Sequence, residues 1–288
     1  MTDRQDAVEQ HYTSPDLGAA ILAALQRMGK DIENLTPDDL APVDEFHGGQ
    51  RPATMRLAEL AGLAELAGLA ELTVRGGGKR VLDVGSGLGG PSRFLAWRYG
   101  CRVSGVDLTA EFVRIAEMLT RRTGLADKCD YREGDALALP FGDESFDVVW
   151  AQNAAMNIAD RDRLYREMRR VLKRGGRLAL QEVAAGPGGP PHFPVQWARE
   201  PAISFLFSAS ETRAKLEAAG LRVLVWQDTT AEALEAAARR TRNTVREPPP
   251  LGTHLILGPD WRAMFANSAR NLEERRTELF NAVLERTA

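Results

Sequence analysis

From residue 79 onward, short apolar runs alternate with longer stretches whose apolar residues recur every three or four positions. The short runs predict strands, and the wider spacing predicts helices that bury one face. The predicted strands cover residues 80–84, 102–106, 129–133, 146–152, 177–183, 222–227 and 253–257. The predicted helices cover 89–99, 110–123, 161–172, 210–219 and 231–245, with a last one from about 260 to 285. This alternation predicts an α/β fold, a mostly parallel sheet of seven strands with helices on both faces.

Before this region the chain lacks strand signals, and its apolar spacing predicts helices only. One helix is expected at 16–28 and another from about 53. Between them, Thr36 can cap a helix that has Pro37 at its first position.

These differences divide the chain into a helical N-terminal lid over residues 1–78 and a core over 79–288. Within the core, the Gly- and Pro-rich segment 186–194 predicts a loop. It opens an insertion at about 186–210.

A short internal repeat interrupts the lid. The hexapeptide A-E-L-A-G-L occurs at 58–63 and again at 64–69, and its leucines recur every third residue. On a helix with 3.6 residues per turn, such leucines wind around the axis and cannot all face one side. We therefore expect the helix to break near Gly62 or Gly68, and we interpret the repeat as a local duplication.

Composition sets broad limits on function. The chain has 288 residues, 44% of them hydrophobic, and a formal net charge of −3. Such a chain can bury a substantial core, and its charge gives no reason to expect a nucleic acid or membrane partner. Two cysteines are too few for a disulfide framework, and no N-terminal apolar segment is visible. We expect a cytoplasmic location.

The most informative motif is the strand-to-helix turn R-V-L-D-V-G-S-G-L-G-G at 80–90. Its glycines leave the backbone open to a ligand. The pattern Gly85-x-Gly87-x-x-Gly90, with Asp107 about 20 residues on, also satisfies a dinucleotide fingerprint. A pyrophosphate, however, is disfavoured beside the carboxylate of Asp83, which suits a cationic group such as an α-ammonium. A nicotinamide oxidoreductase is therefore the rival interpretation.

Three later segments favour the cationic ligand. They are G-D-A-L-A-L-P-F at 134–141, S-F-D-V-V-W-A-Q-N at 145–153 and V-L-K-R-G-G-R-L-A-L at 171–180. In this order and with the glycine turn, they resemble the class I S-adenosylmethionine-dependent methyltransferases, which have a Rossmann-like fold. The nearest subgroups are those of the sarcosine/dimethylglycine N-methyltransferases and the ubiquinone/menaquinone C-methyltransferases. The resemblance covers about residues 79–183.

The resemblance implies a role for each matching residue in S-adenosylmethionine binding. Asp83 would lie near the ammonium group, Asp107 would bind both ribose hydroxyls, and Asp135 would accept from the adenine amine. The remaining cofactor residues would line the methionine part, the adenine or the transfer centre, with Tyr12 in the lid. They are Gly85, Ser86, Gly87, Gly89, Leu108, Ala136, Gln152, Asn153 and Tyr12.

An acceptor that must lose a proton needs a base. The candidates are His47 in the lid, His192 in the loop after the fifth strand, and Glu182 at the end of that strand. Residues expected to contact the acceptor are Phe46, Met156, Asn157, Phe193, Trp197 and Arg199. Arg199 or Arg213 would meet a carboxylate if the acceptor resembled an amino acid.

The resulting hypothesis is an enzyme that transfers the methyl group of S-adenosylmethionine to a small molecule by in-line displacement. N- or C-methylation is expected, S-adenosylhomocysteine is the product, and no metal is expected because no acidic cluster is visible. A natural-product O-methyltransferase and a non-catalytic S-adenosylmethionine-binding protein are the alternatives. The acceptor's identity and the choice between monomer and homodimer stay open.

Overall fold

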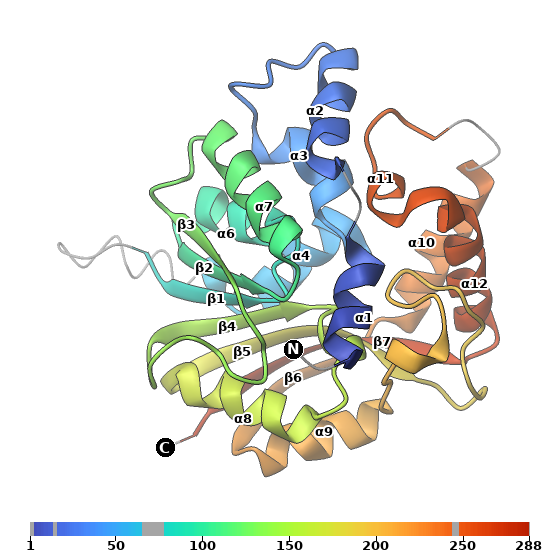
Figure 1. Ribbon diagram of the computed structural model, residues 1–288. Coiled ribbons are helices and arrows are strands. Elements are labelled where there is room, and N and C mark those ends of the chain that lie inside the picture. Colours follow the sequence, from blue (N-terminus) through green and yellow to red (C-terminus); the bar gives the residue numbers. More distant parts are fainter. Residues whose placement is uncertain (1–2, 14–15, 65–77, 244–247, 288) are drawn as a thin grey trace.

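The computed structural model describes residues 3–13, 16–64, 78–243 and 248–287. Its centre is a seven-stranded sheet in the order β3-β2-β1-β4-β5-β7-β6 (Figure 1). Strands β1 to β6 all run in the same direction, and only β7 is reversed, pairing antiparallel with both β5 and β6. The strands are β1 (Arg80–Val84), β2 (Arg102–Asp107), β3 (Cys129–Glu133), β4 (Phe146–Gln152), β5 (Leu172–Ala185), β6 (Leu221–Asp228) and β7 (Thr277–Arg286). The predicted fold class, a seven-stranded and mostly parallel sheet, is confirmed.

Helices cover both faces of the sheet, as the alternating pattern predicted. Helices α8 and α9 pack on one face, and α4, α6 and α7 pack on the other (Figure 1). Helices α1, α10 and α12 lie toward one end of the strands. The helices are α1 (Asp3–Tyr12), α2 (Leu17–Arg27), α3 (Pro37–Asp44), α4 (Gln50–Leu60), α6 (Gly90–Tyr99), α7 (Ala110–Arg122), α8 (Arg161–Val171), α9 (Ala209–Ala218), α10 (Thr230–Asn243), α11 (His254–Leu257) and α12 (Trp261–Glu273).

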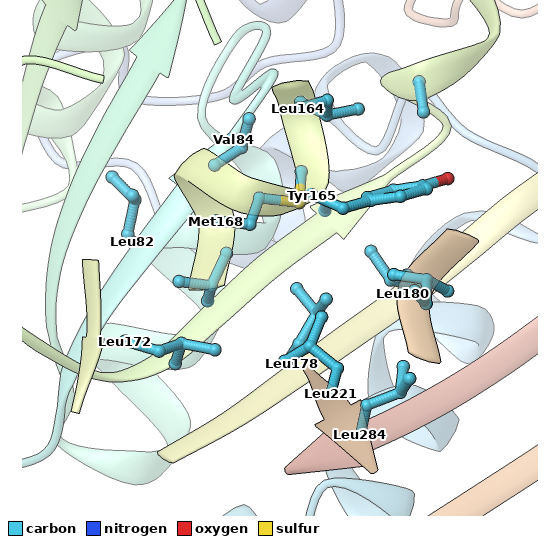
Figure 2. Close-up of a cluster of buried hydrophobic side chains, with 14 of the residues drawn as sticks. Leu82, Val84, Leu164, Tyr165, Met168, Leu172, Leu178, Leu180, Leu221 and Leu284 are labelled. Atoms are coloured by element: carbon cyan, nitrogen blue, oxygen red, sulfur yellow. The ribbon is translucent and has the colours of Figure 1, made fainter. Parts of the chain in front are cut away.

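The largest buried cluster lies between the sheet and helix α8 (Figure 2). Leu164, Tyr165 and Met168 of α8 meet Leu178 and Leu180 of β5 there, and all five are inaccessible to solvent. The helical spacing of the three α8 residues matches their common face, because residues three and four apart share one side of a helix. This packing holds α8 against the sheet.

The C-terminal predictions were wrong. Residues 253–257, expected as a strand, form the short helix α11, and the helix expected over 260–285 ends at Glu273. The last ten residues of that span lie in and around β7, which is hydrogen bonded to strands on both sides. Pairing with β5 and β6 provides hydrogen-bond partners for the backbone of β7 and buries both of its faces. The free energy gained in this way outweighs the local preference for a helix.

The N-terminal region contains only helices among its described residues, and several local predictions are confirmed. Thr36 caps α3 through a capping box with Asp39, and Pro37 occupies the first helical position. Helix α4 ends at Leu60, and Gly62 has a φ of 68°. The helix therefore breaks near Gly62, one of the two positions predicted from the leucine repeat. The remainder of the repeat, with Gly68, lies outside the described residues.

Two further observations concern the whole described chain. Cys101 and Cys129 are both buried, and burial raises the pKa of each thiol to about 12. None of the described helices combines the length and the apolar character that a crossing of the bilayer requires.

Candidate functional site

A large cavity of about 810 Å³ opens at the carboxyl ends of the central strands. This is where ligands bind in open α/β sheets. We distinguish two parts by their linings. The strand-end part is formed by Asp83, Gly85, Ser86, Gly87, Asp107, Leu108, Asp135, Ala136, Gln152 and Asn153. The apolar part is formed by Val8, Met156, Val183, Trp197, Ala233, Ala237, Trp261, Phe265, Ala269, Leu272 and Leu279.

The glycine turn forms the floor of the strand-end part. Gly85 has a φ of 74°, and a Cβ atom on it would lie 2.6 Å from the Cβ of Ala154, so a side chain is excluded there. The backbone N–H groups of Gly85 and Ser86 both donate to the carbonyl of Val106, which ties the turn to β2. The turn thus exposes backbone to the cavity while its own shape is fixed.

Asp83 is the buried carboxylate beside this turn, with 2% of its surface exposed. Ser92 in the first turn of α6 donates its hydroxyl to Asp83 Oδ2 at 2.6 Å. Burial raises the pKa of Asp83 to about 7, and the nearby charge of Asp107 adds to the rise while the Ser92 hydrogen bond opposes it. Such a carboxyl favours a cationic ligand, which would relieve the unfavourable burial of its charge.

Asp107 and Asp135 follow at the ends of the next two strands. Asp107 accepts backbone hydrogen bonds from Gly87 at 2.8 Å and Thr109 at 2.9 Å. Burial raises its pKa, although these hydrogen bonds oppose the rise. Asp135 accepts from the backbone of Leu137 and from the side chain of Gln5, each at 2.8 Å, so α1 covers this end of the cavity.

Two polar atoms of the strand-end part are buried without a protein partner. They are Ser86 Oγ and Asn153 Oδ1. Asn153 has a φ of 52°, which holds it in a sharp turn directly after β4. Buried polar atoms are normally hydrogen bonded. These two therefore indicate a polar ligand at this position.

His47 lies in a buried polar network between the two parts of the cavity. Its Nε2 is 2.8 Å from Glu45 Oε2, and Thr54 donates its hydroxyl to the same carboxylate oxygen at 2.6 Å. The Gln152 side chain is 3.4 Å from His47 Nδ1 and donates to Gln181 at 2.8 Å. Only 3% of the His47 side chain is exposed.

The network determines which nitrogen of His47 can act as a base. Glu45 is a carboxylate and only accepts, so in the neutral ring Nε2 carries the proton, and Nδ1, which lies 3.3 Å from the Gly48 carbonyl and 3.4 Å from the Gln152 amide, is the nitrogen that can accept one. Burial alone would raise the pKa of Glu45, but its hydrogen bond with His47 and the charges of His47 and Arg51 hold it below its usual value. An ionised Glu45 orients the ring and stabilises its protonated form.

Glu45 and Thr54 were not among the site residues predicted from the sequence. A carboxylate two residues from a candidate histidine was visible in D-E-F-H at 44–47, but only the turn after α3 brings the two side chains together.

The structure does not bring His192 to the cavity. Its Nε2 lies 2.8 Å from Glu274 Oε2, and its backbone N–H donates to the Asn271 side chain. These contacts hold the loop around His192 against the end of α12. Phe193 next to it packs in the neighbouring hydrophobic cluster and does not line the cavity.

Three other expected site residues also lie away from the cavity. Arg199 forms an ion pair with Asp260. Glu182 is fully buried on the opposite face of β5, 4.0 Å from the guanidinium of Arg161. Burial raises the pKa of Glu182 to about 7, and the charge of Arg161 opposes this rise.

Gly89, whose φ is 80°, packs against Tyr131 and Arg93 instead of the cavity. Arg213, considered as a carboxylate partner, pairs with Glu217.

The other expected residues of the acceptor side line the cavity. Tyr12 donates to Asn157 Oδ1 at 3.0 Å, and its ring packs against Phe46. Asn157 in turn donates to the carbonyls of Trp197 and Ile203, each at 2.8 Å. These bonds join α1, the turn after β4 and the insertion at 186–210.

Much of the apolar part comes from elements that the sequence analysis assigned no role. Helix α12 contributes Trp261, Phe265, Ala269 and Leu272, whose spacing of four, four and three residues places them on one face. Helix α10 contributes Ala233 and Ala237 by the same spacing. The periodicity of these apolar residues can be seen in the sequence, but the surface that this helix face covers cannot.

No group of three or more His, Cys, Asp and Glu side chains within the described ranges is arranged to hold a metal ion.

The chain is similar to known methyltransferases in the region of this site. The family described as a methyltransferase domain matches residues 82–180. Methyltransferase GfsG of Streptomyces halstedii is 41% identical over 106 residues, 37% of this chain and 38% of that protein. The glycine/sarcosine/dimethylglycine N-methyltransferase of Actinopolyspora halophila is 37% identical over 37% of this chain and 19% of its own length. The chain thus spans less than two fifths of these relatives.

Similarity in structure extends over the whole chain. The crystal structure of the [4+2]-cyclase SpnF is 26% identical, with a TM-score of 0.64, and the alignment covers 100% of this chain and 98% of that one. The resemblance noted in the sequence is confirmed. Residues 82–180 match the family described as a methyltransferase domain, in the region where the sequence motifs indicated it.

Proposed function

We propose that the chain binds S-adenosylmethionine in the strand-end part of the cavity and transfers its methyl group to a small molecule held in the apolar part. The observation that carries the proposal is the convergence of Asp83, Asp107 and Asp135 on one cavity, around a glycine turn that exposes backbone. Three carboxylates at successive strand ends suit a ligand with an ammonium group, a pair of hydroxyls and an exocyclic amine.

Each carboxylate takes one group of the ligand in this proposal. Asp83 binds the ammonium, Asp107 the ribose hydroxyls and Asp135 the adenine amine. Ser86 Oγ and Asn153 Oδ1 gain the partners that they lack within the protein. The bound sulfonium supplies an activated methyl group.

The rest of the chemistry falls to the protein. The apolar part holds the acceptor in line with the methyl group and excludes water. His47 Nδ1 accepts the proton that the acceptor atom loses, and Glu45 stabilises the resulting charge. The bond from carbon to the acceptor forms as the bond from carbon to sulfur breaks, and the proton later passes from His47 to water. N- or C-methylation and the O-methylation alternative all use this arrangement.

Calorimetry with the full-length chain tests the cofactor. S-adenosylmethionine and S-adenosylhomocysteine are expected to bind with dissociation constants in the micromolar range, about 1–100 µM, and NADH is not expected to bind. Absence of binding at about 1 mM S-adenosylmethionine would overturn the proposal, and tight NADH binding would favour the oxidoreductase.

Cofactor affinity is expected to depend on pH through Asp83. Below its pKa of about 7 this carboxyl is protonated, so binding an ammonium group must release a proton. Affinity is therefore expected to fall about tenfold between about pH 8 and about pH 6. Calorimetry in buffers of different ionisation enthalpy measures the proton release. The variant Asp83→Asn should bind more weakly and lose this dependence, and a variant with the same pH profile would show that another group titrates.

A second candidate function has one specific observation in its favour. One of the structures that match this chain along its whole length belongs to a protein named as a [4+2]-cyclase, so the fold alone does not decide the reaction. A screen for transfer of radiolabelled methyl onto pooled metabolites separates the two. Labelled product with release of S-adenosylhomocysteine is the result expected of a methyltransferase.

A further inference from the structure

We infer that the methyl acceptor is a large, uncharged and mostly apolar molecule, and not an amino acid or another small charged amine. The inference rests on the proposed function and concerns the apolar part of the same cavity. It is drawn from the walls of that part, from the positions of the charged side chains and from the size of the cavity.

Apolar side chains from several different elements form most of the wall of this part. Val183 and Leu279 come from the ends of two neighbouring strands, Trp197 from the insertion, and Phe265, Ala269 and Leu272 from one face of α12. Several of them also pack together in one hydrophobic cluster. Such a surface gains free energy by removing apolar area from water, so it favours a ligand with extensive apolar area.

The charged side chains of the cavity lie elsewhere or are already paired. Asp83, Asp107 and Asp135 belong to the strand-end part, and Asp44 forms a fully buried ion pair with Arg93 at 2.6 Å. Asp160 and Arg163 also line the cavity, but both are exposed, and Arg163 donates to the carbonyl of Leu137.

The arginines that a carboxylate would need are not available inside. Arg199 and Arg213 are paired with Asp260 and Glu217 away from the cavity. Arg262 lines the cavity but is itself exposed, with its guanidinium 4.3 Å from the ring centroid of Trp261, so it lies at the rim. An acceptor with a carboxylate would thus bury that charge without a counter-charge from these residues, which is strongly unfavourable.

The polar groups beside the apolar part are largely engaged with one another. Ser268 donates to the Gln196 side chain, and the Asn157 amide is held by two backbone carbonyls. These groups can orient a few hydroxyls or carbonyls of an acceptor but offer no binding site for a compact zwitterion. His47, at the junction of the two parts, is the group positioned to meet the reacting atom.

The size of the cavity points the same way. Its volume of about 810 Å³ comprises both parts and lies toward the upper end of the ~300–1,000 Å³ typical of small-molecule sites, which leaves room for an acceptor beside S-adenosylmethionine. A glycine-sized acceptor would leave most of the apolar part without contacts, so it would be poorly held for in-line transfer.

The test uses the full-length chain saturated with S-adenosylhomocysteine, whose binding is measured first. Geraniol, farnesol and testosterone serve as neutral apolar probes of increasing size, and glycine and sarcosine as charged ones. Calorimetry and the fluorescence of Trp197 and Trp261, which line the apolar part, report binding. We expect at least one apolar probe to bind with a dissociation constant below about 100 µM and neither amino acid to bind at about 10 mM.

Matched variants locate the site. Ala269→Trp fills the apolar part from α12, and Ala263→Trp adds the same ring to the exposed side of that helix, outside the cavity. We expect the first variant to weaken probe binding at least about tenfold and the second to leave it within about twofold, both with unchanged S-adenosylhomocysteine affinity. Ala233→Phe, on the neighbouring helix α10, repeats the test from a second element of the wall if Ala269→Trp does not fold.

The outcomes separate this inference from the proposed function. If S-adenosylhomocysteine does not bind, both are wrong. Suppose that S-adenosylhomocysteine binds, that glycine or sarcosine also binds, and that no apolar probe binds. In that case only the inferred class of acceptor is wrong. Apolar binding that survives both Ala269→Trp and Ala233→Phe would also overturn the inference, because the probe would then lie outside this part.

Discussion

Replacing Asp107 by alanine is expected to abolish measurable cofactor binding at micromolar concentrations. In the proposed function this buried carboxylate binds two ribose hydroxyls. A hydrogen bond to a charged group contributes about 1.5–3 kcal/mol, so losing two predicts an affinity loss of about 10²-fold or more. Calorimetry with S-adenosylhomocysteine measures it.

A second variant separates ligand binding from the shape of the turn. Asp107 also accepts hydrogen bonds from the backbone of Gly87 and Thr109, so Asp107→Ala can loosen the glycine turn. Asp107→Asn keeps the side-chain volume and an acceptor oxygen but removes the charge, and we expect an intermediate loss. Asp130→Ala, an exposed aspartate bonded to Ser104 outside the cavity, is the matched control. Binding that is unchanged in Asp107→Ala would contradict the ribose role.

Replacing His47 by alanine is expected to reduce kcat by about 10²–10⁴-fold, the usual contribution of a general base, for an acceptor that must lose a proton. Cofactor affinity should change by less than about threefold, because His47 does not belong to the strand-end part. Turnover of the acceptor found by the methyl-transfer screen and calorimetry with S-adenosylhomocysteine provide the two readouts.

Glu45→Gln tests the positioning role of the carboxylate. The ring nitrogen would lose its ionised partner, so kcat should fall while the KM of the acceptor changes little. This split between kcat and KM distinguishes the positioning role from a merely structural one. His192→Ala, outside the cavity and paired with Glu274, is the control and should keep normal turnover. Normal turnover in His47→Ala would remove the base from the mechanism.

The strand-end part of the cavity could be predicted because its residues follow from local pattern and parallel topology. Asp83, Asp107 and Asp135 each lie at or near the end of a strand that the apolar runs had identified. Carboxyl ends of parallel strands meet at one edge of a sheet, so the side chains converge without any further information. The same reasoning placed Gln152 and Asn153 on the cavity.

The apolar part could not be predicted in the same way. It depends on which face of α12 packs over the strand ends, and that choice is made by contacts between residues far apart in the chain. His192 and Arg199 had suitable chemistry and a suitable position in the sequence. Their nearest partners, Glu274 and Asp260, come from the C-terminal region and hold both side chains outside the cavity.

The strand β7 illustrates the same limit for the fold. Thr277–Arg286 carries a pattern that reads as a helix, yet it lies between β5 and β6 and is hydrogen bonded on both sides. Tertiary pairing decides such cases because local preference for a helix differs from that for a strand by little per residue.

The amino-acid sequence by itself determined the α/β class, the glycine turn and the carboxylates of the strand-end part, because these depend on periodicity and on short-range backbone geometry. Only the tertiary structure decided the course of the C-terminal region, the pairing of Glu45 with His47 and the lining of the apolar part. The physical reason is that each of these depends on packing and hydrogen bonds between segments brought together only by folding, whose energies outweigh the local preferences of the chain.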